Sequence, residues 1–315
     1  YGKEHPEYYS LVTPERWIGM PKPDVPTRRS DPTVSGPWQL CTSNKDVRKI
    51  IAKQIAASKD GRIRSISPND GYGFCECAEC KAQDGEDAKR TGKAGHLWVT
   101  NRMYDFAQDI AWQVYKLNPK AKVGLFAYSF YDGIPDQKIK FPPNMYLSYC
   151  YFIGFTKDKA AEDEINNKII GLGKTGAQVV GREYWGTHYT MNYPLNHSRK
   201  IDRNVKTLYE CNAAGIYGET GKNFGSRASD LYILCKLAWN PTLKREALLK
   251  EFCDAAFGKK ASPVMYELFE KIEDWVEDHT KEFKTKKGVN FKYYKNDYAE
   301  FNRFQASIFN EEFNK

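Results

Sequence analysis

The residues best suited to do chemistry lie in one run, SISPNDGYGFCECAEC, which spans residues 65–80. The run offers an amide and a carboxylate at Asn69 and Asp70, and it then places three thiols within six residues. A short β-pattern over residues 62–66 leads into it, and in parallel α/β folds the loops that follow strands carry the chemistry. Asn, Asp and Gly also favour tight turns, so Asn69-Asp70-Gly71 has a purely structural interpretation as well.

Four of the eight cysteines could meet in space, namely Cys41, Cys75, Cys77 and Cys80. Four thiolates suit tetrahedral zinc, and such a site would pin the loop that bears Asp70. Two disulfides are the rival interpretation, favoured if the protein is exported. A Cys-x-Cys pair is awkward to bridge internally, so Cys41 would have to bond one of the other three. Free thiols are the third interpretation, and the spacing alone leaves all three open.

The elements that must position these residues alternate between short strands and helices. Six strands are expected, at residues 38–41, 62–66, 122–127, 145–151, 178–181 and 215–218. A helix is expected after Ser43 or Asn44 as the N-cap, with an apolar stripe of Val47, Ile50, Ile51 and Ile55. Further helices are expected at residues 96–117, 160–172, 199–212, 228–238, 244–257 and 263–279, and the remainder through residue 315 is expected to form one more helix. Alternation without hairpin signals predicts a parallel sheet with crossover helices.

The predicted fold class is α/β, a (β/α)8 TIM-like barrel of which this chain holds about six βα units plus C-terminal helices. The six strands would be strands three to eight, and an open doubly wound sheet is the alternative. Residues 1–240 would form the partial barrel and residues 241–315 a helical extension packed on it. The first two strands would lie upstream of Tyr1, so an upstream segment or a second chain would complete the barrel.

Polar and aromatic residues gather where the predicted strands end. Asn69 and Asp70 follow one strand, and Glu183 and Glu219 follow two others. The aromatic and imidazole side chains expected beside them, as substrate-binding residues, are Tyr128, Tyr149, Tyr151, Tyr184, Trp185 and His188. On a barrel all of these would converge on one face, and carboxylates among aromatic rings are typical of a glycosidase.

The Asn69-Asp70 pair suggests a particular mechanism. Some retaining hexosaminidases use the 2-acetamido oxygen of the substrate as nucleophile, with one residue orienting the acetamide and an adjacent acid protonating the leaving group. Asn69 would hold the acetamide and Asp70 would supply the proton. The ordinary scheme of two carboxylates, Asp70 with Glu183 or Glu219, is the competitor.

The run at residues 65–80, preceded by QLCTSNKDV and followed by FCDAAFGKKASPVMYELFEKIE, resembles domain-of-unknown-function family 4838. HPEYYSL near the start is also similar to that family, and the resemblance covers residues 1–279. The family includes glycoside hydrolase family 163, whose members act as endo-β-N-acetylglucosaminidases on N-glycans. The resemblance therefore implies a barrel and retaining, substrate-assisted hydrolysis of N-acetylhexosamine-containing glycans, with no cofactor in catalysis.

Composition narrows the class of partner. The net charge is +8, from 48 basic and 40 acidic residues that are largely scattered, and no nucleic-acid motif is present. No apolar run approaches the roughly 18 residues that a membrane helix needs. We expect a glycan or glycoprotein partner and a secreted, periplasmic or cell-surface location. The alternative function is a non-catalytic glycan-binding or cell-surface protein that keeps a degenerate glycosidase-like barrel.

Overall fold

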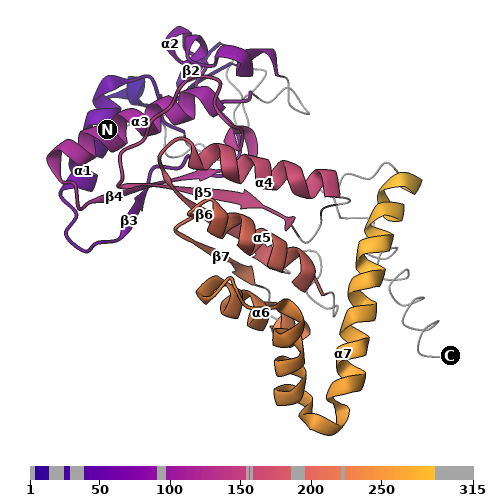
Figure 1. Cartoon of the computed structure of the whole chain (residues 1–315). Coiled ribbons are helices and arrows are strands. Elements are labelled where there is room, and N and C mark those ends of the chain that lie inside the picture. Colours follow the sequence, from indigo (N-terminus) through magenta and orange to yellow (C-terminus); the bar gives the residue numbers. More distant parts are fainter. Residues whose placement is uncertain are drawn as a thin grey trace.

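Five parallel strands, in the order in which they occur along the chain, form the main sheet of the computed structural model (Figure 1). The strands are β3 (Ile63–Ser65), β4 (Lys122–Ala127), β5 (Met145–Tyr151), β6 (Gln178–Trp185) and β7 (Gly215–Thr220). The structure describes residues 4–13, 25–28, 39–90, 97–153, 156, 159–185, 196–220 and 224–287. The sheet curls into a half-barrel, and its sequential order lacks the reversal that defines a doubly wound sheet.

Helices α4 (Lys159–Gly173) and α5 (Ser198–Glu210) lie in front of the sheet in Figure 1, and α7 (Arg245–Lys287) stands away from it. The other helices are α1 (Lys45–Ala56), α2 (Ala78–Ala82), α3 (Thr100–Leu117) and α6 (Ala228–Trp239). Short 3₁₀ turns lie at Pro6–Tyr8, Gly85–Lys89, Ser129–Tyr131 and Phe224–Arg227. Among the described residues, no helix is both long and apolar enough to cross a membrane.

Local sequence explains where the first helix begins and how it packs. The Asn44 side chain accepts hydrogen bonds from the backbone N–H groups of Asp46 and Val47, at 2.9 and 3.1 Å, which confirms Asn44 as the N-cap. Arg48 is buried and pairs with Asp105 of α3 at 2.8 Å. This ion pair fixes α1 against α3 beside the start of the sheet.

Alternation along the strands separates two faces of the sheet. In β5, Met145, Leu147, Tyr149 and Tyr151 are buried, and the residues between them are half-buried. The buried set faces the helical side, where α4 packs on β5 and β6. The half-buried set, with its counterparts on the neighbouring strands, lines the opposite, inner face of the half-barrel.

The strand predicted at residues 38–41 is not part of this sheet, so the prediction of six strands was wrong. Leu40 instead forms an isolated antiparallel bridge with Tyr9. The backbone groups on either side are engaged there too, because Ser10 N donates to Gln39 O at 3.0 Å and Cys41 N to Tyr8 O at 2.8 Å. β3 therefore lies at the edge of the described sheet, contrary to the prediction.

A second, small sheet was not anticipated. Leu11–Val12 (β1) and Thr27–Arg28 (β2) pair antiparallel, although the sequence between them carries no recognisable hairpin signal. The remaining strands lie where they were expected. β4 and β5 match to the residue, and β6 and β7 each run further than predicted.

The C-terminal helix α7 turns back on itself at Gly258, where the backbone has a φ of 76° (Figure 1). Glycine adopts this left-handed conformation without steric cost, and Pro263 follows five residues later in the second arm. The two arms correspond to the helices predicted at residues 244–257 and 263–279. The further helix predicted after residue 279 is described only through residue 287, where it continues α7, and residues 288–315 lie outside the described part of the chain.

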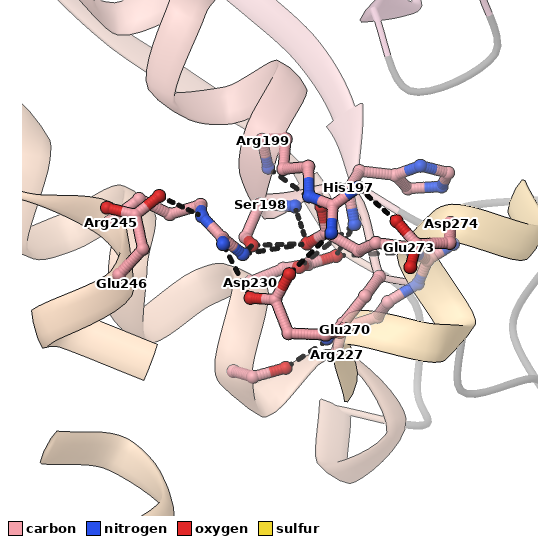
Figure 2. A network of polar contacts seen from close by, with 12 residues as sticks. His197, Ser198, Arg199, Arg227, Asp230, Arg245, Glu246, Glu270, Glu273 and Asp274 are labelled. Atoms are coloured by element: carbon pink, nitrogen blue, oxygen red, sulfur yellow. Dashed lines mark hydrogen bonds and ion pairs between the residues drawn. The ribbon is translucent and has the colours of Figure 1, made fainter. Parts of the chain in front are cut away.

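A buried polar network joins the second arm of α7 to α5 and α6 (Figure 2). Glu273 accepts hydrogen bonds from the backbone N–H groups of Ser198 and Arg199 at 2.8 and 3.1 Å. It thereby caps N–H groups at the start of α5 that have no acceptor within the helix. Both oxygens of Asp230 accept the His197 N–H at 3.1 Å. These contacts seat the C-terminal helices on the half-barrel.

The close approach of α5 to β6 generates a prediction about stability. A Cβ atom on Gly181 would lie 2.6 Å from the Tyr151 hydroxyl and 3.0 Å from a methyl group of Leu208. Gly181→Ala should therefore lower the free energy of unfolding by about 1–3 kcal/mol through overpacking. Chemical denaturation measures this loss.

Gly215 of β7 is the matched control, because a Cβ there meets nothing within 4 Å. Gly215→Ala should change the unfolding free energy by less than about 0.5 kcal/mol. Equal effects of the two substitutions would contradict the tight packing of α5 on the sheet at Gly181.

Candidate functional site

The four predicted cysteines come together in one buried cluster. Each offers a sulfur, and the four sulfurs lie within 4.8 Å of one another. The Cys41 sulfur lies 3.8 Å from that of Cys77 and 3.9 Å from that of Cys80. Cys75 and Cys77 precede α2 and Cys80 lies within it, while Cys41 follows the bridge at Leu40. All four are free thiols, and the group can hold a metal ion.

Polar groups contact the sulfurs of the cluster. The Leu11 N–H donates to the Cys75 sulfur at 3.3 Å, and the Cys80 sulfur is the donor to the Ser43 hydroxyl oxygen at 3.2 Å. Hydrogen bonds with Cys41 and Cys75, and then the charge of Arg102, lower the pKa of Cys80. Hydrogen bonds with Cys41 and Cys80 raise the pKa of Cys75, so the sulfurs of the cluster differ in how readily they ionise.

Arg102 of α3 locks the cysteine loop onto the protein core. It is 1% exposed, and its Nε and Nη2 donate to the two oxygens of Asp84 at 2.5 Å each. Its Nη1 donates to the backbone carbonyl of Cys75. A bidentate pair of this kind is among the stronger charged contacts in proteins, so the loop is held from two directions.

The Asn69-Asp70 turn at the other end of this loop is fixed by a buried amide. Gln39 donates from Nε2 to the carbonyl of Asn69 at 2.7 Å and accepts the Asn69 N–H on Oε1 at 3.1 Å. Gly71 and Gly73 follow with φ values of 110° and 87°. Asn69 and Asp70 are themselves exposed. The turn is therefore rigid in its backbone while it presents both side chains outward.

Arg182 is the centre of a second cluster, on the inner face of the half-barrel. Its side chain is only 14% exposed and pairs with Glu219. It also donates to the Tyr184 hydroxyl and lies 3.7 Å from the Cys150 sulfur. Its guanidinium lies over three aromatic rings, at 5.2 Å from the centroid of Phe126, 4.8 Å from Tyr184 and 6.0 Å from Tyr217.

Strand register explains this gathering. Arg182 is the pairing partner of Cys150 on β5 and of Tyr217 on β7, and Tyr184 pairs with Glu219. Residues paired in a parallel sheet point to the same face, so this group shares the inner side. The sequence analysis missed Arg182, Cys150 and Tyr217 because only the register between strands reveals which residues meet.

Asp70 and Tyr128 belong to the same electrostatic environment. Burial raises the pKa of Tyr128, and the nearby Asp70 raises it further. Cys150 and Glu219 act in the same direction, whereas the charge of Arg182 opposes them. The structure thus brings together four residues that the sequence analysis selected, namely Asp70, Tyr128, Tyr184 and Glu219.

Three other selected residues lie on the opposite face, inside the core. Tyr149 and Tyr151 are 3% exposed, and the Tyr151 hydroxyl donates to Asn204 of α5 at 2.7 Å. Glu183 is 1% exposed and accepts the Ile153 N–H at 2.7 Å. None of the three reaches the inner face, because each alternates with a residue that does. The Trp185 side chain and His188 lie outside the part of the chain that the structure describes.

Burial makes Glu183 an unusual acid. Desolvation raises its pKa to about 8, although hydrogen bonds from the backbone of Ile153 and Tyr184 and the charges of Lys200 and Arg227 act against the rise. Burial likewise raises the pKa of Asp230 to about 7. Glu183 therefore holds its proton at neutral pH, between the sheet and the helices.

The chain is thus an α/β protein with a parallel half-barrel sheet, a buried four-cysteine cluster and a polar, aromatic inner face. The model of one protein family, described as a domain of unknown function (DUF4838), matches residues 1–270. The chain belongs to this family. No curated protein matches it.

Glu183 generates a prediction about the pH dependence of stability. Its pKa is about 8 in the folded protein, whereas the ordinary value of 4.5 applies to the unfolded chain. Between these two pH values the folded state therefore binds a proton that the unfolded state has lost. The stability linked to this group is complete below about pH 4.5 and is lost as the pH rises through 8, by about 1.4 kcal/mol per pH unit. Glu183→Gln should remove this slope, as measured by denaturation at several pH values between 5 and 8.

Asp230 titrates in an overlapping window, so the informative quantity is the difference between wild type and variant at each pH. Glu164→Gln, at a side chain of α4 that is 72% exposed, is the control and should leave the slope unchanged. A pH-independent difference between wild type and Glu183→Gln would contradict the buried proton.

Proposed function

We propose that this protein is a glycoside hydrolase acting on N-acetylhexosamine-containing glycans, as an endo-β-N-acetylglucosaminidase. The observation that carries the proposal is that an exposed Asp70, on a rigid turn, lies near Tyr128 beside the inner face that Tyr184 and Glu219 line. These residues belong to the C-terminal ends of parallel strands, where enzymes of this architecture place their chemistry. Carboxylates beside aromatic rings also match what glycosidic cleavage needs.

In the proposed mechanism the substrate supplies its own nucleophile. The acetamide oxygen attacks the anomeric carbon, and the bond to the leaving oxygen breaks as that oxygen takes the proton of Asp70. Water then adds to the anomeric carbon and returns a proton to Asp70, which restores the acetamide with retained configuration. Asn69 orients the acetamide, and the hold of Gln39 on the Asn69 backbone keeps the two neighbours in fixed relation.

The competing scheme pairs Asp70 with a second carboxylate. Glu183 is buried behind the sheet, so a substrate on the inner face does not reach it. Glu219 is on the correct face, but its carboxylate is paired with Arg182. An ion pair of this kind suits a binding group better than a nucleophile, which favours the substrate-assisted scheme.

A non-catalytic glycan-binding protein is the second candidate function. The aromatic rings and polar groups of the inner face serve binding as well as cleavage. Hydrolysis of an aryl N-acetylglucosaminide or a glycoprotein separates the two functions from each other. Retention on a glycan column without cleavage would favour the binding protein. Either function suits a secreted, periplasmic or cell-surface location.

We further propose that the cysteine cluster binds structural zinc. Zinc–sulfur bonds of about 2.3 Å in a tetrahedron place the sulfurs roughly 3.8 Å apart. The distances of 3.8 and 3.9 Å from Cys41 to Cys77 and Cys80 fit this spacing. The metal would hold Cys41 and the loop of residues 65–80 together, and would so stabilise the turn at Asp70.

Completion of the barrel is part of the same proposal. Within the described residues, β3 and β7 each have a partner strand on one side only. Bare edges of this kind expose backbone donors and acceptors, which proteins normally cover. An upstream segment or a second chain would supply further strands and turn the half-barrel into a closed TIM-like barrel.

Substitution of Asp70 tests the catalytic assignment. Asp70→Asn keeps the size of the side chain but removes the proton donor, so turnover on glycans should fall about 100-fold or more. The loss should be smaller on activated aryl glycosides, because their leaving group needs little protonation. Asn69→Ala should damage acetamido substrates alone. Steady-state kinetics on the two substrate types measures both effects.

Asp60, an exposed carboxylate shortly before β3, provides the matched control. Asp60→Asn should leave turnover unchanged. Full activity of Asp70→Asn, together with loss of activity in Glu219→Gln, would move the acid to Glu219 and return Asn69-Asp70-Gly71 to a plain turn.

Metal analysis tests the zinc proposal. The purified protein should contain about one zinc per chain, and Cys77→Ser should lose the metal and lower the melting temperature. Cys235→Ser, at an exposed thiol of α6, should keep it. Absence of zinc combined with four thiols that react only after reduction would show disulfides instead.

A further inference from the structure

Tyr217 and Glu219 form a partly exposed patch to which the proposed mechanism assigns no step. They lie two residues apart on β7, so both side chains face the inner side of the sheet. Tyr217 is 44% exposed, and the Glu219 side chain is 42% exposed. β7 is the last strand of the described sheet, so the patch lies at the opposite end of the inner face from β3.

Arg182 organises this patch. Its guanidinium lies over the Tyr217 ring and also pairs with Oε1 of Glu219. The pair is neutral as a whole, which disfavours an anionic ligand. A carboxylate has about four acceptor positions, so Glu219 retains acceptor capacity while it bonds Arg182. An aromatic ring beside a held acceptor suits a neutral sugar, whose C–H face packs on the ring while a hydroxyl donates to the carboxylate.

The patch also lies in one row with Tyr128, the residue near Asp70. Ala127 pairs with Tyr149, Tyr149 with Gly181, and Gly181 with Ile216. The next residue on each strand therefore falls in one row across the inner face, from Tyr128 through Cys150 and Arg182 to Tyr217. Three strand intervals separate the ends of this row, roughly 14 Å along the sheet. A single sugar ring cannot contact both ends.

We infer that Tyr217 and Glu219, held by Arg182, form a second sugar subsite, and that the substrate is therefore an oligosaccharide that spans the inner face. This inference rests on the proposed function for the class of ligand. It adds a binding site at β7 that is separate from the acid and from the acetamide-orienting residue at Asn69-Asp70.

Binding to sugars of two lengths tests the subsite. Calorimetry with tetra-N-acetylchitotetraose and with N-acetylglucosamine is carried out in an Asp70→Asn background, so that the longer sugar is not consumed. Tyr217→Ala should weaken binding of the tetrasaccharide about tenfold and leave binding of the monosaccharide unchanged. Tyr217→Phe keeps the ring and should restore tetrasaccharide binding to within about twofold.

Two further variants keep the test decisive. Tyr209→Ala removes a ring of α5 that is 64% exposed on the helical side, and it should leave both affinities unchanged. Glu219→Gln should weaken the tetrasaccharide alone, and it replaces Tyr217→Ala as the informative variant if that protein does not fold. Circular dichroism checks folding in each case.

The outcomes separate the subsite from the catalytic proposal. If the wild type binds the tetrasaccharide in a Tyr217-dependent manner but does not cleave it, the hydrolase proposal fails and the subsite stands. Equal binding of the tetrasaccharide by Asp70→Asn with and without Tyr217→Ala overturns the subsite. The absence of measurable tetrasaccharide binding to the Asp70→Asn protein overturns it as well.

Discussion

The charge of Arg182 is the constraint on which the inner face depends. A guanidinium that is largely removed from water requires nearby acceptors and polarizable surroundings, since an uncompensated buried charge costs several kcal/mol. The neighbouring strands supply them as Glu219, the Tyr184 hydroxyl and three aromatic rings. Because each partner must face Arg182, this one side chain orders the polar residues of β6 and β7 into a single surface.

A second constraint acts on the loop between β3 and α2. Its two ends are held by different chemistry, by Gln39 at the Asn69 backbone and by sulfur contacts and Arg102 at Cys75. Between these anchors, Gly71 and Gly73 adopt positive φ values that other residues rarely tolerate. The loop thus combines a fixed backbone with outward-facing side chains, which is what a positioned acid and its neighbour require.

The sequence predicted most of the helices and two strands almost to the residue, because their periodic apolar patterns are local. β4 and β5 are runs buried on one or both faces, and the Asn44 cap marks the start of α1. β6 was predicted too short because Arg182 and Glu183 read as the end of a strand. In the structure β6 continues through both residues. The charge of Arg182 is compensated by Glu219, and Glu183 is buried with its carboxyl group protonated. The segment at Leu40 was misplaced because its pairing partner, Tyr9, is chosen by the tertiary fold.

The candidate site, too, was predictable where it depends on local sequence and unpredictable where it depends on tertiary contacts. Cys75, Cys77 and Cys80 followed from spacing alone, because three thiols within six residues cannot lie far apart. Cys41 was added as the end of a neighbouring strand, and it joins the cluster although that strand is not part of the sheet. Arg182 and Tyr217 could not be found from spacing, since their meeting depends on the register of β6 against β7.

Neighbouring carboxylates of similar sequence context acquire opposite properties from this arrangement. Glu183 and Glu219 each occur near the end of a strand, yet one faces the helices and the other faces the inner side. Burial keeps the proton on Glu183 up to about pH 8 in a place that no ligand reaches, so its protonation bears on stability. Glu219 is reachable but is held by Arg182, so its contribution is to binding. Of the carboxylates selected from the sequence, Asp70 alone lies near the inner face without an arginine that compensates its charge. The role of acid is therefore proposed for Asp70, and the role of a binding group for Glu219.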